Sequence, residues 1–153
     1  MVDAQPATDA RALLRDATRA SLATAMRGDR HGWPFASLVL IASDRDGAPL
    51  MLLSDLAEHS RNIVADNRIS LLIDGTAGFD DPLSGPRLTV LGRAERSADA
   101  DHRRRFLARH PSAAQYADFT DFAVYHVAVD SAHLVAGFGR IHWIEAAALL
   151  EQE

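Results

Sequence analysis

A hairpin signal at Asp46-Gly47, set between two apolar runs, is the feature that most constrains the fold of this chain. The run before it, residues 34–42 (PFASLVLIA), is rich in β-branched and bulky apolar residues, and residues 50–54 (LMLLS) follow it. Asp-Gly between such runs is typical of a turn that joins antiparallel strands. Most of the other predicted strands also follow each other by hairpins. An antiparallel barrel with peripheral helices is therefore favoured over a parallel sheet.

Further elements are predicted from periodicity and turn residues. We expect a helix capped by Thr8 and ending near residue 18, a second helix at 58–65, a third beginning at Ser97, and a short one opened by Pro111. Residues 75–86 are too rich in Gly, Pro and Asp for regular structure. The remaining strands are expected at residues 21–25, 69–74, 87–96 with a glycine bulge at Gly92, 122–130, and 133–144 broken by Gly137 and Gly139.

One predicted strand is apolar on both faces. Leu38 and Leu40 lie on one side of it, and Val39 and Ile41 lie on the other. One of these faces can fill a barrel, but the other needs helices, a ligand or another subunit to cover it. The pattern therefore predicts a homodimer.

Composition narrows the class of protein. The 153 residues, 48% of them hydrophobic, are expected to form a single domain, with residues 1–8 flexible and residues 145–153 a helical tail. A net charge of −5 argues against nucleic-acid binding. There is no apolar run long enough for a membrane span and no secretory signal at the N-terminus, so we expect no membrane association and a cytoplasmic location.

The segment LLSDLAEHSRNI, residues 52–63, raises the possibility of an anion site. A strand runs into Ser54, and His59, Ser60 and Arg61 follow at a helix start, where free N–H groups and the helix dipole favour a negative charge. Hydroxyl, amide and guanidinium donors suit a phosphate monoester. Taken alone, the same residues describe an ordinary cap and a solvated arginine. All 16 basic residues are arginine, so any phosphate contact by a basic side chain must use arginine.

Three segments in this order, LLSDLAEHSRN (52–62), DPLSGPRLT (81–89) and AGFGRI (136–141), resemble a known superfamily. They are similar to the FMN-binding split barrels of the pyridoxamine 5'-phosphate oxidase-like proteins, and most of all to the branch called heme-iron utilisation proteins. The resemblance covers residues 9–145. It implies a mainly β fold, a six- to seven-stranded antiparallel Greek-key split β-barrel, that dimerises around two FMN sites.

The resemblance also implies a cofactor site. The flavin ring would lie along Ser37, Leu38 and Val39. The phosphate would be bound by Ser54, Ser60 and Arg61, with His59 and Asn62 adjacent. The second subunit would contribute Arg140 and Trp143. The oxidase itself uses two lysines, and Ala42 and Asn62 stand about where they would fall, which predicts a weaker hold on FMN.

The function implied by the resemblance is an FMN-dependent oxidoreductase acting on an unknown small substrate or electron donor. No residue stands out as a catalytic acid or base, and no metal site is predicted. Two alternatives stay open: a heme-binding or heme-utilisation protein on the same barrel, with His126, His133 and His142 as conceivable iron ligands, and a non-catalytic flavin-binding module. The heme-degrading relatives carry a further C-terminal region, so the expectation is weak heme binding without turnover.

Overall fold

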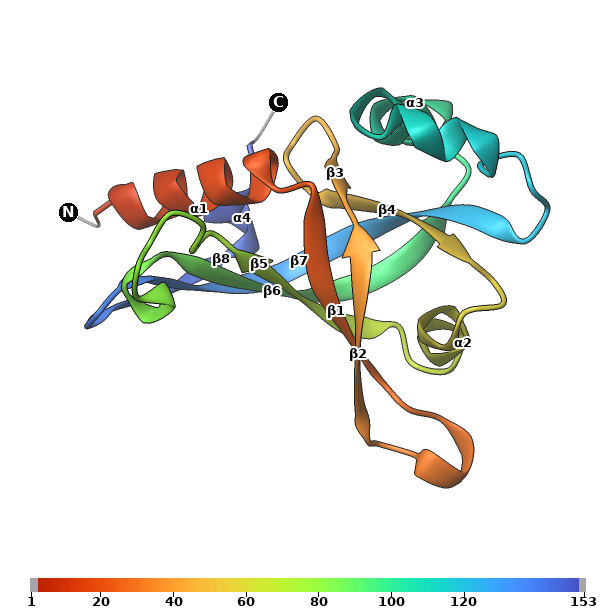
Figure 1. Ribbon diagram of the computed structural model, residues 1–153, viewed down its shortest axis with the longest axis horizontal. Coiled ribbons are helices and arrows are strands. Elements are labelled where there is room, and N and C mark those ends of the chain that lie inside the picture. Colours follow the sequence, from red (N-terminus) through yellow and green to blue (C-terminus); the bar gives the residue numbers. More distant parts are fainter. Residues whose placement is uncertain (1–2, 152–153) are drawn as a thin grey trace.

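The computed structural model describes residues 3–151 as one curved antiparallel sheet with helices at its margins (Figure 1). The strands occur in the order β2-β1-β5-β6-β7-β4-β3, and β8 pairs with β7. Their bounds are β1 Arg19–Ala25, β2 Pro34–Leu40, β3 Ala42–Ser43, β4 Pro49–Ser54, β5 Arg68–Asp74, β6 Arg87–Ser97, β7 Phe122–Gly137 and β8 Arg140–Glu145. Within the described chain, β2 at one end of this order pairs only with β1, so the barrel is split rather than closed.

The structure thus confirms the antiparallel split barrel and the hairpin at Asp46-Gly47. Asp44 N–H donates to the Ala48 carbonyl at 2.8 Å, and Gly47 N–H donates to the Asp44 carbonyl at 3.0 Å. Gly47 has φ +92°, a left-handed conformation that glycine adopts without a steric penalty. This hairpin connects β3 to β4.

The predicted bulge at Gly92 is present, and the extra residue belongs to the partner strand. The register of β6 and β7 shifts here: Leu91 pairs with Ser131 and Gly92 with Val129, which leaves Asp130 unpaired. A Cβ at position 92 would lie 2.6 Å from the Ala128 carbonyl oxygen, so a side chain would collide with the backbone of β7. Gly92 therefore permits the close approach of the two longest strands.

The last predicted strands needed correction. Residues 122–137 form one 16-residue strand, β7, instead of two, and β8 follows after a turn at residues 138–139. β7 continues because its first half pairs with β4 and its second half with β8, while β6 lies along its other edge. Gly137 and Gly139, with φ +147° and +72°, mark a hairpin turn between two strands instead of a break within one.

The helices lie at the ends of the sheet (Figure 1): α1 Gln5–Asp16, α2 Glu58–Ala65, α3 Ala100–Arg109 and α4 Ala146–Leu149, with short 3-10 turns η1 Gly28–Arg30, η2 Pro82–Ser84 and η3 Pro111–Gln115. α2 matches its predicted bounds. α1 begins earlier than predicted because Pro6 suits a first turn, and Thr8 lies inside the helix instead of capping it. α3 begins later, because the Asp99 side chain caps it by accepting from Asp101 N–H at 2.8 Å.

The core lies between the concave face of the sheet and the helices. Leu22, Leu71, Val90 and Val127 are fully buried along the central strands, and Leu14 of α1 packs against them. A smaller cluster around Phe106 attaches α3 to β3 and β4. The residues expected to be flexible at the N-terminus enter α1 at Gln5, and residues 152–153 of the expected tail lie outside the described part. No helix among residues 3–151 is long and apolar enough to cross a membrane.

Candidate functional site

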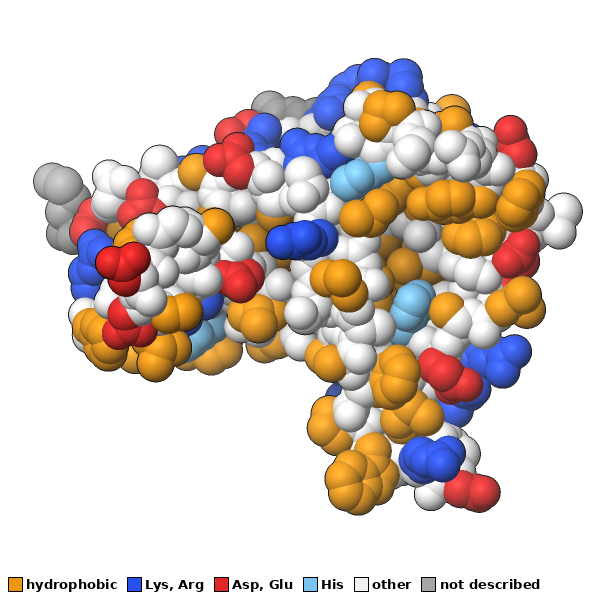
Figure 2. All heavy atoms as spheres, viewed as in Figure 1, with side chains coloured by type: hydrophobic (Ala, Val, Ile, Leu, Met, Phe, Trp, Pro, Cys, Tyr) orange, Lys and Arg blue, Asp and Glu red, His pale blue; other side chains and the backbone are white. Residues whose placement is uncertain are grey.

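A cleft of about 240 Å³ opens where the barrel fails to close. Its walls are β2 and β4, with α2 at one end and α3 and η3 beside it. Most of its lining is apolar, including Leu38, Leu52, Phe106, Tyr116 and Phe122, and His59 also lines it. Figure 2 shows hydrophobic side chains gathered below α3 on this face of the molecule. A cleft of this character suits a flat, largely apolar ligand.

His59 is the histidine that lines this cleft. Its Nδ1 lies 3.1 Å from the Ser37 hydroxyl of β2, while no described residue pairs with its Nε2. Burial lowers the pKa of His59 below its ordinary value of 6.5, because desolvation disfavours the imidazolium. The ring is therefore neutral at pH 7, fixed through one nitrogen and free at the other. A neutral imidazole of this kind is a metal ligand or a proton acceptor.

Ser54 and the helix start are arranged differently from a simple anion site. The Ser54 hydroxyl donates to Asp121 Oδ2 at 2.8 Å and accepts from Leu56 N–H at 3.2 Å. Asp55 pairs with Arg96 at 2.8 Å. The Asp121 carboxylate thus stands near the point where the phosphate was predicted, and like charges repel. The predicted role of Ser54 in phosphate binding remains a prediction.

Ser60 and Asn62 are buried beneath α2 rather than exposed on it. The Ser60 hydroxyl has no hydrogen-bond partner within residues 3–151, and the residue is 1% exposed. Asn62 accepts from Arg27 at 2.6 Å and donates to the Thr24 hydroxyl at 3.0 Å. These contacts attach α2 to β1. Arg27 also pairs with Glu58 at 3.1 Å, so its charge is already neutralised.

Among the residues predicted to bind the phosphate, Arg61 is the one with a positively charged side chain that has no ion-pair partner in the described chain. It is exposed on α2, and its guanidinium has no partner among the described residues. The N-cap residue of α2, Ala57, offers no capping side chain. Arg61 therefore remains accessible for an anionic group of a ligand.

The remaining predicted residues divide between two regions. On β2, Ser37 contacts His59, Leu38 is 73% exposed at the cleft mouth, and Val39 belongs to the core. Arg140 and Trp143 lie on β8, at the end of the sheet remote from α2 (Figure 1). Within one chain the structure does not bring these two groups together.

Of the three histidines considered as iron ligands, two lie on β7 and one on β8. His133 packs against Trp143 with ring centroids 4.8 Å apart, and His142 lies on the same strand as that tryptophan. His126 faces Asp44 instead. The sequence analysis did not identify four residues of this region: Arg27, Asp121, Phe106 and Tyr116. Each is distant in sequence from the residues it lies beside, and no local sequence pattern indicates its position.

The fold and the cleft define a protein of the split β-barrel class. Residues 3–151 match the CREG β-barrel family, and the chain belongs to that family. The fold implied by the resemblance to the pyridoxamine-phosphate oxidase-like barrels is likewise confirmed. A pyridoxinephosphate oxidase family protein from Clostridium acetobutylicum, related to general stress protein 26, has a TM-score of 0.72 at 11% identity over 97% of this chain and 99% of the other, which shows the shared fold.

Two relatives with higher identity are heme proteins by name. The non-canonical heme oxygenase HOZ of Arabidopsis thaliana, a chloroplastic protein, is 34% identical over 109 residues. The match covers 69% of this chain and 33% of HOZ, so the chain corresponds to about one third of that relative. A heme binding protein from Mycobacterium smegmatis is 32% identical with a TM-score of 0.87, covering 97% of this chain and 60% of that one.

The buried hydroxyl of Ser60 yields a test of its role. Replacing it with alanine removes an unpaired buried polar group and adds a better helix former, so Ser60→Ala should raise the free energy of unfolding by about 1 kcal/mol. Asn62→Ala is the matched contrast: it removes the bond to Arg27 and leaves the buried Thr24 hydroxyl without its amide partner, and it should lower that free energy by about 2–3 kcal/mol. Urea denaturation measures both. A destabilising Ser60→Ala would show that its hydroxyl has a structural partner after all.

Proposed function

We propose that this chain binds heme in the cleft between β2 and β4, with His59 Nε2 as a ligand to the iron. The proposal rests on one observation, the state of His59. Its neutral imidazole lies beside an apolar cleft, Ser37 holds Nδ1, and no described residue pairs with Nε2. Hydrogen bonding at the second ring nitrogen is the usual way in which a protein orients a metal-ligating histidine. An axial histidine is a common protein ligand of heme iron.

The two heme proteins among the relatives support this proposal, since each is more than 30% identical to the chain. The apolar lining of the cleft suits the porphyrin plane. Arg61, which has no partner within the described chain, offers a charge for a propionate. When bound, heme supplies iron redox and oxygen chemistry. The protein supplies orientation through His59 and Ser37 and excludes water with Leu38, Leu52 and Phe106.

FMN is the second candidate ligand, and with it an FMN-dependent oxidoreductase of a small substrate. The exposed guanidinium of Arg61 on α2, a helix with no side-chain cap, favours it, because such donors suit a phosphate. Asp121 and the burial of the Ser60 hydroxyl weigh against it. We therefore rank heme before FMN, which reverses the order that the sequence alone favoured.

We also propose that the chain forms a homodimer. Leu38 is 73% exposed and Leu40 is 42% exposed, on a strand whose outer edge has no partner in the described chain. A second copy that covers this face would remove apolar surface from water and close the cleft.

The heme proposal predicts a specific loss on mutation. Titrating ferric heme into the wild-type protein should give a sharp Soret band at one heme per cleft. His59→Ala should broaden the band and weaken binding by more than about tenfold, because outer-shell partners of a metal-ligating histidine alone contribute about 10–100-fold in affinity. Ser37→Ala removes only the orienting hydroxyl, so its heme affinity should lie between those of the wild type and His59→Ala.

His133→Ala is the control, because His133 lies on β7 against Trp143 and should leave the titration unchanged. The lowered pKa of His59 adds a pH signature. Protons compete with iron for Nε2 only below the folded-state pKa, which burial lowers from the ordinary value of 6.5, so affinity should hold as pH falls through 6.5 and decline only at lower pH. An unchanged Soret band in His59→Ala would contradict the assignment.

FMN binding is tested separately through Arg61. If this guanidinium holds the flavin phosphate, Arg61→Ala should weaken FMN binding roughly thirtyfold or more, because truncating one partner of a charged pair costs about 2–5 kcal/mol. Riboflavin, which lacks the phosphate, should bind both proteins equally. Fluorescence quenching of the flavin measures both ligands. Equal FMN affinity in wild type and Arg61→Ala, both folded, would remove Arg61 from the phosphate site.

The dimer is tested by placing a charge on the exposed face of β2. Leu38→Asp should shift the sedimentation coefficient from a dimer to a monomer, because the carboxylate would be buried without a partner at the interface. Val64→Asp, at an apolar position 80% exposed on α2, is the control and should stay dimeric. A wild-type monomer in the same experiment would eliminate the two-subunit cleft.

A further inference from the structure

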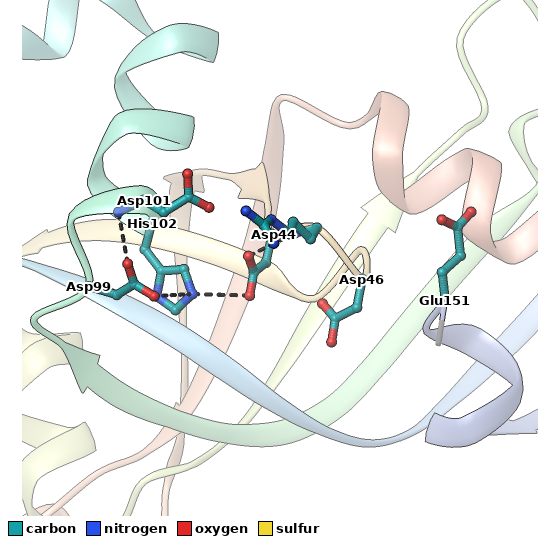
Figure 3. Close-up of a pocket in the computed structure, with 7 residues that line it drawn as sticks. Asp44, Asp46, Asp99, Asp101, His102 and Glu151 are labelled. Atoms are coloured by element: carbon teal, nitrogen blue, oxygen red, sulfur yellow. Dashed lines mark hydrogen bonds and ion pairs between the residues drawn. The ribbon is translucent and has the colours of Figure 1, made fainter. Parts of the chain in front are cut away.

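Three side chains from distant parts of the chain meet one turn of α3 before Phe106, outside the cleft described above. Asp44 comes from the β3–β4 hairpin, His102 from α3 and His126 from β7. Asp44 Oδ2 lies 3.0 Å from His102 Nε2 and 3.4 Å from His126 Nε2, and one ligand atom from each residue lies within 4.8 Å of the other two. Figure 3 shows the Asp44 carboxylate and the His102 ring pointing toward each other.

Other contacts hold these groups in place. Arg45 N–H donates to Asp44 Oδ1 at 2.7 Å, so the second oxygen, Oδ2, is the one turned toward the histidines. The Ser97 hydroxyl lies 2.7 Å from His102 Nδ1 and directs Nε2 toward Asp44. The two imidazole rings are stacked, with centroids 5.0 Å apart and planes inclined by 10°.

The surroundings favour a cation. The side chains of His102, Asp44 and His126 are only 15%, 18% and 25% exposed, so water competes weakly for them. Asp44 and His102 border a hollow of about 530 Å³ whose lining includes Asp46, Asp99 and Glu151. The guanidinium of Arg105 is 4.0 Å from Asp44 Oδ1 and is paired with Asp101 at 2.8 Å, and Arg45 also lines the hollow. Clustered carboxylates raise the local concentration of cations.

We propose that Asp44, His102 and His126 bind a divalent transition-metal ion, with zinc as the best match. Two imidazole nitrogens and one carboxylate oxygen form a donor set that zinc accepts, and a fourth position open to the hollow can hold water. Zinc lies about 2.0–2.2 Å from such ligands, which places tetrahedral ligand atoms about 3.4 Å apart. The 3.4 Å separation of Asp44 Oδ2 from His126 Nε2 already matches that spacing, and the 3.0 Å separation from His102 Nε2 is somewhat shorter.

Binding requires two local changes. The stacked rings must turn so that both Nε2 lone pairs converge on the ion, and both imidazoles must be neutral with their protons on Nδ1. For His102 the neighbouring Ser97 hydroxyl is then the acceptor of the Nδ1 proton, the kind of outer-shell contact that fixes a metal-binding tautomer. The site uses none of the residues of the heme cleft and stands independently of that proposal.

Competition with a chromophoric zinc chelator, on full-length protein freed of metal by dialysis against a chelator, tests this site. Wild type should take up one zinc ion per chain and show a higher melting temperature with zinc. His126→Ala and Asp44→Asn should each lower the affinity roughly 100-fold, and Ser97→Ala should lower it about 10-fold, as expected for an outer-shell contact. Asp44→Asn keeps the shape of the side chain, so a loss of zinc affinity in this variant reports the loss of the carboxylate and not misfolding.

His31→Ala, at an exposed histidine between β1 and β2, is the matched control and should bind zinc like wild type. Substitution with Co²⁺ gives a second readout, since intense visible bands from wild type and their loss in His126→Ala would report tetrahedral coordination by these ligands. No stoichiometric uptake by wild type, or equal affinity in His126→Ala and wild type, would overturn the proposal.

Discussion

The candidate site depends on one constraint of the fold: β2 and β4 do not pair with each other. Seven neighbouring strands follow one another around the curved sheet, but the ends do not join, because β4 pairs with β7 on one edge and with the short β3 on the other. β2 therefore keeps an open edge, and the space between the two ends stays accessible. His59 enters that space because α2 begins four residues after β4 ends. The same gap leaves Leu38 exposed, which is why one chain presents both a cleft and an apolar face.

Local features of the chain were predictable because they rest on local physics. The hairpin at Asp46-Gly47, the helix at residues 58–65 and the glycine at the bulge follow from turn chemistry, apolar periodicity and backbone sterics. The unbroken β7 was not predictable in this way. Its continuity depends on a change of partner from β4 to β8, and the extra residue Asp130 opposite Gly92 interrupts the alternation by which a strand is recognised.

The site was harder to predict than the fold, because partners distant in sequence decide what each polar residue does. Ser54 fits a phosphate site by sequence, yet its hydroxyl donates to Asp121, 67 residues away. Asn62 stands beside Arg61 in the sequence but is buried with Arg27 and Thr24. His59, by contrast, was named from its position at the helix start. What the sequence could not indicate is that Ser37 would hold its Nδ1 and leave Nε2 unpaired.

α3 connects the cleft between β2 and β4 to the proposed metal site, since Phe106 lines the first and His102, one turn earlier, belongs to the second. The central claim, however, concerns His59 alone. A crystal structure of the protein with ferric heme tests it most directly. We expect the porphyrin between β2 and β4, its iron bonded to His59 Nε2, and His59 Nδ1 still bonded to the Ser37 hydroxyl. Iron bonded to His126, His133 or His142, or heme bound outside this cleft, would contradict it.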